Sequence, residues 1–288
     1  MALRPHVLRF RRRDTAPIPD APVAVVLSGG GNRGATQVGM LRALVESGVR
    51  PGIIVGTSVG SLNGAGLASD PSMQGVEMLE DVWLGISRER LFADGRLTRA
   101  WRLASRASHL WANEGLSQLI DAFGVNHFFE LRVPLRVIAA DLITGEEAVF
   151  GSGPLKPALL ASCALPGLYP PVEHDGRVLI DGGVLNNVPV AHALAGPVSH
   201  VYVCDTSADF DTGTPRSALE VMLRAFAIAR QSRARRDQER YGHDPRVTFL
   251  PRVPDGRRTF DFSRSAEQIE KGYEAASAFL KSRTQDVG

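Results

Sequence analysis

The chain has 288 residues, of which 44% are hydrophobic and 22% are charged, and its formal net charge is +2. This balance is typical of a globular protein with a substantial core, and so small a net charge predicts no nucleic-acid partner. No apolar run reaches the roughly 18 residues of a membrane-spanning helix, and the N-terminus lacks the apolar segment of a signal peptide, so we expect a cytoplasmic protein. Cys163 and Cys204 lie in apolar contexts and are expected to be buried free thiols.

Strand and helix patterns alternate along most of the chain. Residues 1–21 are predicted to form a basic, proline-containing mobile arm, and residues 22–284 a single domain without an internal linker. The predicted strands are the β-branched runs Val23–Leu27, Ile53–Val55, Leu135–Ala140, Glu147–Phe150, Val178–Ile180, His200–Cys204 and Val247–Leu250. Helical patterns separate most of these strands, which predicts the α/β class.

Two long helices are predicted in the last third of the chain. The first begins at Thr214-Pro215 and becomes polar on all sides over residues 230–240. A solvated helix end is preferred there over contact with anionic headgroups. The second helix is predicted to start with a capping box formed by Ser265 and Gln268.

The first predicted strand ends in a glycine-rich turn over residues 29–34. Closely spaced N–H groups at a helix start stabilise an anion. The same residues fit the dinucleotide fingerprint G-x-G-x-x-G, but a nicotinamide site also needs a carboxylate at the end of the second strand. No carboxylate lies between Glu46 and Asp70. The dinucleotide interpretation is therefore set aside in favour of an anion hole.

The second predicted strand leads into Gly56-Thr57-Ser58-Val59-Gly60. This is the G-x-S-x-G elbow, in which a sharp turn between a strand and a helix exposes a serine hydroxyl. The alternative is an ordinary turn serine, but small residues on both sides favour the elbow. A nucleophile beside an anion hole predicts acyl transfer.

A serine nucleophile needs a base within hydrogen-bond reach. In α/β-hydrolases the serine is followed by an acid and then by a histidine, and three histidines follow Asp181 in this chain. His192 fits the side of a helix, His200 opens a strand at the wrong end, and His243 lies in a charged loop and stays open as a candidate. Because none has the setting of a catalytic histidine, a Ser-Asp dyad has to be weighed.

Three aspartates end or follow predicted strands. Asp141 precedes a hairpin and is suited to bonding its own turn, whereas Asp205 is a reasonable second candidate. Asp181 ends an apolar strand and precedes two glycines, so its carboxylate can lie against a closely approaching backbone. Asp181 is therefore preferred.

Together, the three motifs at residues 29–34, 56–60 and 181–183 resemble those of patatin-like phospholipases, a family of lipid acyl hydrolases. Further stretches at residues 62–65, 161–167 and 270–273 match in style, and the resemblance spans roughly residues 22–282. It implies a bacterial-type enzyme with a three-layer α/β/α fold, a mostly parallel central sheet and helices on both faces. No cofactor and no metal are expected.

The resemblance also implies roles for individual residues. Ser58 would be the nucleophile and Asp181 its base, with an oxyanion hole formed by the backbone of Gly30, Gly31 and Asn32. The remaining motif positions are Gly29, Arg33, Gly34, Gly56, Gly60, Gly182 and Gly183.

The expected function is hydrolysis of a phospholipid or another fatty acyl ester, with possible peripheral membrane contact. The aromatic segment 72–130 is a candidate for the acyl-chain pocket or lid, although rings that merely fill the core explain it equally well. The alternatives are an esterase or thioesterase with a Ser-Asp-His triad and a non-catalytic lipid-binding or regulatory module. The sequence predicts no oligomeric state.

Overall fold

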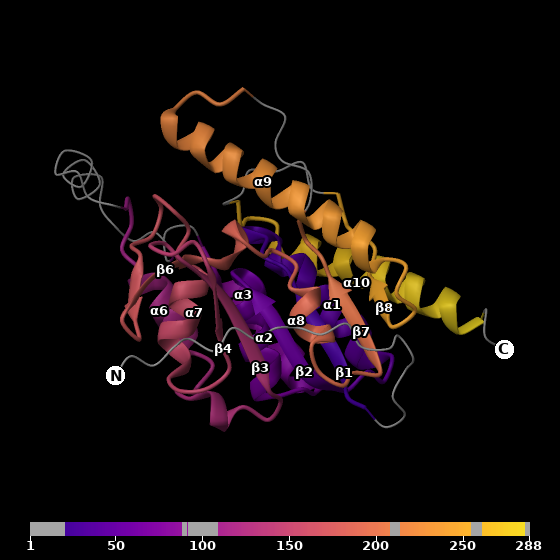
Figure 1. Ribbon diagram of the computed structural model, residues 1–288. Coiled ribbons are helices and arrows are strands. Elements are labelled where there is room, and N and C mark those ends of the chain that lie inside the picture. The colour runs from indigo at the N-terminus through magenta and orange to yellow at the C-terminus, as the bar shows by residue number, and fades with distance from the viewer. Residues whose placement is uncertain (1–20, 88–90, 92–108, 208–213, 255–260, 286–288) are drawn as a thin grey trace.

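The computed structural model of the protein describes residues 21–87, 91, 109–207, 214–254 and 261–285. An eight-stranded sheet runs through its centre in the order β5-β6-β3-β2-β1-β7-β8, with β4 also paired to β3 (Figure 1). The strands are β1 (Val23–Leu27), β2 (Pro51–Thr57), β3 (Leu135–Asp141), β4 (Glu147–Phe150), β5 (Val172–His174), β6 (Arg177–Asp181), β7 (His200–Cys204) and β8 (Val247–Phe249). Strands β3, β2, β1, β7 and β8 are parallel, and β4, β5 and β6 add antiparallel pairs. The predicted α/β class with a mostly parallel sheet is confirmed.

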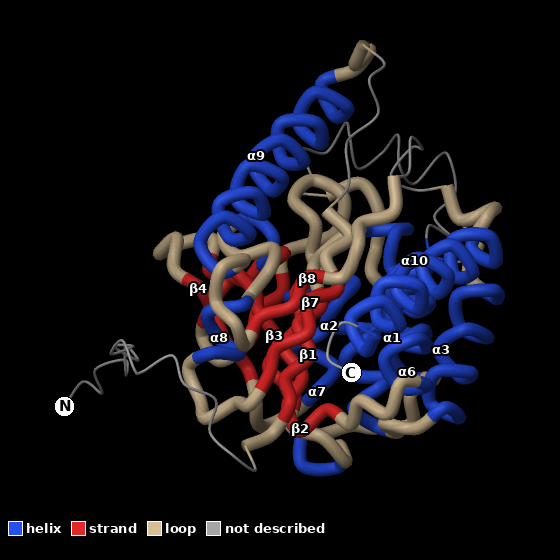
Figure 2. Tube along the Cα trace, turned by 90° about the vertical axis from the view of Figure 1, so that its right-hand side faces the viewer, coloured by secondary structure: helices blue, strands red, loops and turns tan. Residues whose placement is uncertain are grey.

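Helices cover both faces of this sheet (Figure 2). The α-helices are α1 (Gly34–Glu46), α2 (Val59–Ser69), α3 (Met73–Gly85), α6 (Glu114–Asp121), α7 (Leu155–Ser162), α8 (Val190–Leu194), α9 (Ala218–Tyr241) and α10 (Ser265–Gln285). Three single 3-10 turns are η1 (Gly31–Arg33), η2 (Phe128–Glu130) and η3 (Gly182–Val184). Helices α8 and α9 lie on one face, and α1, α2, α3, α7 and α10 lie on the other, which gives the three layers that were expected.

The central strand β1 shows why both faces are covered. Val25 and Leu27 pack into the larger apolar cluster with α1 and α2, whereas Ala24 and Val26 pack into the smaller cluster with α8. All four side chains are at most 1% exposed. A parallel strand buried on both faces needs apolar residues at successive positions, which explains the unbroken run.

The topology brings several loops to one edge of the sheet. The chain builds β1, β2 and β3 outward in one direction and then returns to place β7 on the other side of β1. The loops after β1 and β7 therefore diverge at a switch point, the place where open α/β sheets bind ligands. The turns after β1, β2, β3 and β7 all lie at this carboxyl edge.

Helices α1 and α10 pack closely through a pair of glycines. A Cβ added to Gly39 would lie 1.9 Å from Ile269 O, and one added to Gly272 would lie 2.1 Å from Thr36 O. The Thr36 hydroxyl donates across the same contact to Gln268 Oε1 at 2.5 Å. The helix that follows the first glycine turn is thus held against the last helix of the described chain.

Three local predictions are corrected by the structure. The long helix begins at Ala218, after Ser217 caps it by accepting from Glu220 N at 3.2 Å, rather than at residues 214–215. The capping box is absent, because Ser265 Oγ donates to a carbonyl oxygen and the Gln268 side chain accepts from α1. Strand β5 was not predicted.

Some of the predictions fall on residues that the structure does not describe. The basic arm over residues 1–20 and most of the aromatic segment between α3 and α6, including Trp101, lie outside the described residues. Within the described part of the chain, none of the helices combines the length and the apolar character needed to cross a bilayer.

Candidate functional site

The serine elbow is a tight turn between β2 and α2. Ser58 has φ 55° and ψ −129°, a left-handed conformation that is uncommon for a residue other than glycine. A Cβ on Gly60 would lie 2.3 Å from Leu27 O, and one on Gly56 would lie 2.5 Å from Gly60 O. Only glycine allows the backbones to approach so closely, which gives a physical reason for the G-x-S-x-G spacing.

The structure brings Ser58 and Asp181 together. Ser58 Oγ donates to Asp181 Oδ2 at 2.6 Å, and the N–H of Gly183 donates to Asp181 Oδ1 at 2.8 Å. Asp181 ends β6, whose pairing with β3 places it opposite Ala139, near the end of β2 that carries Ser58. Both side chains are held at the carboxyl edge, with residue exposures of 4% for Ser58 and 1% for Asp181.

The environment of Asp181 makes its carboxylate more basic than usual. Burial raises the pKa of Asp181 to about 6, against the lowering effects of the hydrogen bonds from Ser58 and Gly183 and of the positive charge of Arg230. Desolvation disfavours the charged form of a carboxyl group, and at Asp181 this effect on the pKa is larger than the opposing effects of the hydrogen bonds and of Arg230. A carboxylate with this pKa accepts a proton from a hydroxyl more readily than an exposed aspartate does.

Ser162 fixes the backbone of the elbow and was not singled out as a site residue from the sequence. The N–H of Ser58 donates to Ser162 Oγ at 2.8 Å, and Ser162 Oγ donates to Ile138 O at 2.6 Å. Its side chain, fully buried at the end of α7, thus joins the elbow to β3. The only sequence signal was its place in the stretch 161–167, which matches the family in style.

The first glycine turn presents unpaired backbone donors. Gly31 has φ +62°, the left-handed region that favours glycine, and it opens the turn η1. Within the described chain, no acceptor receives the N–H of Gly30 or that of Gly31. The side chain of Asn32 donates instead to Asp261 O at 2.9 Å. Two orphan N–H groups at a helix start can hold a developing negative charge.

Two side chains from loops far away in the sequence pack against this turn. They leave no room for a Cβ at Gly29 or Gly30. Asn187 is fully buried and donates from Nδ2 to Gly29 O at 3.2 Å; a Cβ on Gly29 would lie 2.6 Å from Asn187 Oδ1. A Cβ on Gly30 would lie 2.4 Å from Thr206 Oγ1. Neither Asn187 nor Thr206 was singled out from the sequence, because each follows a strand far away in the chain.

The two other candidate carboxylates have different partners. Asp205 is fully buried and accepts from Arg252 Nε at 2.8 Å and from Ser207 N at 2.8 Å. Asp141 Oδ1 accepts from Ile143 N at 2.9 Å, so it bonds its own hairpin turn. In the described chain neither carboxylate is hydrogen-bonded to Ser58.

The three candidate histidines also lie apart from the elbow serine. His192 Nε2 lies 2.6 Å from Glu147 Oε2, and His200 Nε2 lies 2.9 Å from Thr248 Oγ1. His243 is exposed in the turn after α9. Among the described residues, Ser58 Oγ is hydrogen-bonded to the carboxylate of Asp181 rather than to an imidazole.

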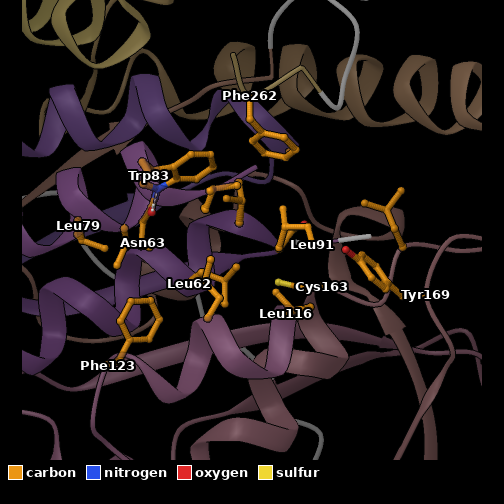
Figure 3. Close-up of a pocket in the computed structure, with 17 residues that line it drawn as sticks. Leu62, Asn63, Leu79, Trp83, Leu91, Leu116, Phe123, Cys163, Tyr169 and Phe262 are labelled. Atoms are coloured by element: carbon orange, nitrogen blue, oxygen red, sulfur yellow. Dashed lines mark hydrogen bonds between the residues drawn. The ribbon is translucent and has the colours of Figure 1, made fainter. Parts of the chain in front are cut away.

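An apolar pocket extends from Ser58 between α2, α3 and α6 (Figure 3). Most of the 17 residues that line it are hydrophobic, among them Leu62, Leu116, Leu119 and Phe123. The side chains drawn in Figure 3 converge from these helices on one space. Such a lining suits a hydrocarbon chain and gives water few partners.

The polar groups of this pocket are hydrogen-bonded within its wall. Trp83 Nε1 donates to Asn63 Oδ1 at 2.9 Å, and Asn63 Nδ2 donates to Gly34 O and to Gln37 Oε1, each at 3.0 Å. Asn63 lines the pocket with both ends of its side-chain amide already hydrogen-bonded. The predicted aromatic segment contributes Trp83 and Phe123 to the lining, whereas Trp111 packs in a separate cluster.

Both cysteines are buried free thiols, as expected. Cys163 lines the pocket, and burial raises the pKa of its thiol well above the usual value. Among the described residues, no group of three or more His, Cys, Asp or Glu side chains is arranged to hold a metal ion.

The chain is similar to known proteins both in sequence and in fold. A family model described as patatin-like phospholipase matches residues 25–194, which contain the three motifs. The chain is 26% identical over 281 residues to lysophospholipase NTE1 of Mycosarcoma maydis, covering 96% of this chain and 14% of that protein. It is 33% identical over 215 residues to the patatin-like phospholipase domain-containing protein ZK370.4 of Caenorhabditis elegans, covering 70% of this chain and 15% of that protein.

The solved structure of VipD from Legionella pneumophila has the same fold, with a TM-score of 0.50 and 14% identity over 92% of this chain and 68% of that one. The chain spans about one seventh of the length of the two curated relatives. Because these two relatives are eukaryotic and VipD is bacterial, the comparisons do not single out a bacterial type.

Proposed function

We propose, since the chain belongs to the patatin-like phospholipase family, that it hydrolyses fatty acyl esters of lipids with Ser58 as nucleophile and Asp181 as general base. The observation that carries this proposal is the 2.6 Å hydrogen bond between Ser58 Oγ and Asp181 Oδ2 at the mouth of an apolar pocket. Phospholipids and lysophospholipids are the first substrates to test, because NTE1 relatives are named lysophospholipases.

The proposed reaction has two halves. Ser58 Oγ attacks the carbonyl carbon of the ester while its proton passes to Asp181, and the carbonyl oxygen becomes an oxyanion. When the intermediate collapses, Asp181 returns the proton to the departing alcohol oxygen and leaves an acyl-serine. A water molecule then gives a proton to Asp181 and attacks the acyl carbon. When the bond between this carbon and Ser58 Oγ breaks, Asp181 returns the proton to Ser58 Oγ and the fatty acid is released.

The proposed oxyanion hole is formed by the backbone N–H groups of Gly30, Gly31 and Asn32. The orphan N–H groups of Gly30 and Gly31 support this assignment within the described chain. A single lost donor of this kind costs about 100- to 1000-fold in rate in other hydrolases. The proposed base works best when it is ionised, that is, above its pKa of about 6.

The apolar pocket is the proposed site of the acyl chain. It begins at Ser58 and Gly31 and continues between Leu62, Leu79 and Phe123, so a chain bound there would hold its carbonyl beside both the nucleophile and the first turn. Positioning of this kind accounts for part of the rate advantage of any enzyme.

We further propose a peripheral contact between the carboxyl edge of the sheet and a lipid surface. Leu142 and Ile143, in the turn after β3, are 51% and 75% exposed, and Val221, Met222 and Ile228 of α9 are 55%, 41% and 48% exposed. Apolar side chains exposed around a lipid site favour contact with a bilayer over contact with water. A cytoplasmic location remains a prediction of the sequence.

Hydrolysis measured with a panel of acyl esters tests the proposal, with Ser58→Ala as the matched control. The wild-type protein is expected to release fatty acid and to be labelled by a fluorophosphonate, and the variant to do neither. Full activity in Ser58→Ala would contradict the mechanism. A folded wild-type protein that is neither active nor labelled would favour the alternative of a non-catalytic lipid-binding module.

A further inference from the structure

Helix α9 brings a buried arginine over the site. Arg230 is 7% exposed, and its Cδ would lie 3.5 Å from a Cβ placed on Gly183. Gly183 is the residue whose N–H holds Asp181. The stem of the arginine therefore covers the loop that carries the proposed base, and Figure 1 shows α9 running across this side of the molecule.

The guanidinium of Arg230 is not bonded directly to an anion. Throughout the described ranges, neither a hydrogen bond nor an ion pair reaches it, although Asp181 and Asp205 act on its charge from a longer distance, and the ring of Phe226 lies 5.7 Å from Cζ. Burying a cation without a bonded anion is costly, so such groups are normally compensated. Arg252 and Arg246, which are more exposed, bond Asp205 and Asp244.

A second buried arginine adds to this positive charge. Arg33, in the first glycine turn, is 4% exposed and acts together with burial to lower the pKa of Arg230, while Asp181 and Asp205 raise it. The Asp205 carboxylate is bound by Arg252. Because burial and the nearby charge of Arg33 both disfavour the charged form of Arg230, an additional anion bonded to Arg230 would stabilise it.

The position of Arg230 indicates which part of a substrate would meet it. The apolar pocket lies on the face of the sheet that carries α2, α3 and α6, whereas α9 belongs to the opposite face. The acyl and alcohol halves of an ester leave its carbonyl carbon in different directions. With the chain in the pocket, the alcohol half extends toward α9.

We propose that Arg230 binds the phosphate group on the alcohol half of the substrate, and that the enzyme thereby selects phosphate-bearing acyl esters over neutral ones. This inference rests on the proposed hydrolysis at Ser58. A guanidinium offers paired N–H donors that match phosphate oxygens, and Arg230 has them unused. Arg230 is thus a specificity-determining residue for the headgroup.

The experiment compares two monomeric substrates with the same acyl chain, octanoyl lysophosphatidylcholine and mono-octanoylglycerol. Arg230→Gln is expected to lower the ratio of their kcat/KM values by about 10- to 100-fold, the effect of losing one charge-assisted hydrogen bond. Arg235→Gln removes an exposed charge from the same helix and should change the ratio by less than about twofold. Arg230→Lys, which keeps the charge without the paired donors, should fall between them and serves if the glutamine variant does not fold.

The inference would be overturned if Arg230→Gln lowered kcat/KM equally for both substrates. It would also be overturned if the acid limb of the pH–rate profile shifted for both substrates while the ratio of their kcat/KM values stayed constant, because Arg230 would then act through Asp181. That result leaves the proposed hydrolysis intact. If Ser58→Ala retains full activity, the mechanism fails instead, whatever the ratio shows.

A binding measurement separates a lipid headgroup from free phosphate without any turnover. Calorimetry with glycerol phosphate is expected to detect binding that Arg230→Gln weakens about tenfold and Arg235→Gln does not. Inorganic phosphate could bind at Arg230 while Arg230→Gln leaves the ratio of the two kcat/KM values unchanged. In that case the site binds free phosphate and the headgroup assignment is wrong. No binding of glycerol phosphate together with an unchanged ratio would also overturn it.

Discussion

Ser58 Oγ and Asp181 Oδ2 lie 2.6 Å apart, although 123 residues separate them in the chain. The contact depends on β3, because one edge of this strand pairs with β2 as far as Ile138 and then with β6 from Ala139, while β4 pairs with the opposite edge. The ends of β2 and β6 therefore meet along the same edge of β3. The second oxygen of Asp181 is held by Gly183 N, so the carboxylate has a fixed orientation toward the serine. In the proposed dyad, this carboxylate takes the place of an imidazole as the acceptor of the serine proton.

Replacing Asp181 should separate catalysis from folding. Asp181→Asn keeps the shape but removes the proton acceptor, and kcat for ester hydrolysis is expected to fall by about 100- to 10,000-fold, the usual contribution of a general base. Asp205→Asn is the matched comparison, because Asp205 bonds Arg252 rather than Ser58. If Asp205→Asn folds and loses more kcat than Asp181→Asn does, Asp205 rather than Asp181 would be the general base.

The same Asp181→Asn substitution should stabilise the fold in a pH-dependent manner. Burial raises the pKa of Asp181 to about 6, so ionising it disfavours the native state, and stability is lost as the pH rises from the unfolded pKa toward 6. The asparagine variant avoids this loss, and the full shift corresponds to about 3 kcal/mol. Urea unfolding on both sides of this pH range measures the effect. A difference between variant and wild type that shrinks as the pH rises would contradict the assignment.

Removing the hydroxyl of Ser162 should loosen the elbow. Ser162→Ala leaves the N–H of Ser58 without a buried acceptor, which costs about 1–3 kcal/mol of unfolding free energy and lowers kcat. Ser69→Ala is the control, because Ser69 Oγ donates to Gly66 O at the far end of α2. Equal effects of the two substitutions on kcat would show that Ser162 has no special part in positioning Ser58.

Filling the apolar pocket should shorten the acyl chain that is accepted. Leu119 lines the pocket and is half-buried, so Leu119→Trp can add volume there without breaking the core. Activity on butyryl esters is expected to persist while kcat/KM for palmitoyl esters falls about tenfold or more. Leu84→Trp, at a 55% exposed position on α3 outside the pocket, is the control. Unchanged chain-length preference in Leu119→Trp would place the acyl chain elsewhere.

The lipid contact can be tested at the carboxyl edge of the sheet. Changing Ile143 and Val221 together to serine should weaken binding to lipid vesicles about tenfold, because two exposed apolar side chains are removed from the contact. Phe129→Ser is the matched control, since Phe129 is 82% exposed but precedes the amino end of β3. Co-sedimentation with vesicles measures the binding. If Phe129→Ser lost more vesicle binding than the double variant, the lipid contact would lie at the amino edge of the sheet instead.

The sequence indicated most of this arrangement, because the constraints on the motifs are local. The elbow glycines follow from backbone approach within a few residues, and the apolar run of β1 follows from burial on both faces. The choice between Asp181 and Asp205 depended on strand order, which no local pattern contains. Arg252, which binds Asp205, had no motif of its own.

Residues that were missed act across long separations. Ser162, Asn187 and Arg230 each come from an element that was predicted only as a strand end or a helix, and only the fold aims their side chains at the site. Strand β5 is three residues long and has an antiparallel partner, so it offers too short a pattern to detect. The capping box was wrong because Gln268 bonds Thr36, a residue 232 positions away.

The close packing of α1 on α10 has a consequence for the order in which the protein matures. The first glycine turn precedes α10 by more than 200 residues, so the glycine face of α1 that supports the turn is covered only once that later helix has been synthesised. Until Gly272 reaches Thr36, the nascent chain exposes that face to water and to proteases. The turn that carries the proposed oxyanion donors is therefore fully supported only after α10 has been synthesised and has packed against α1.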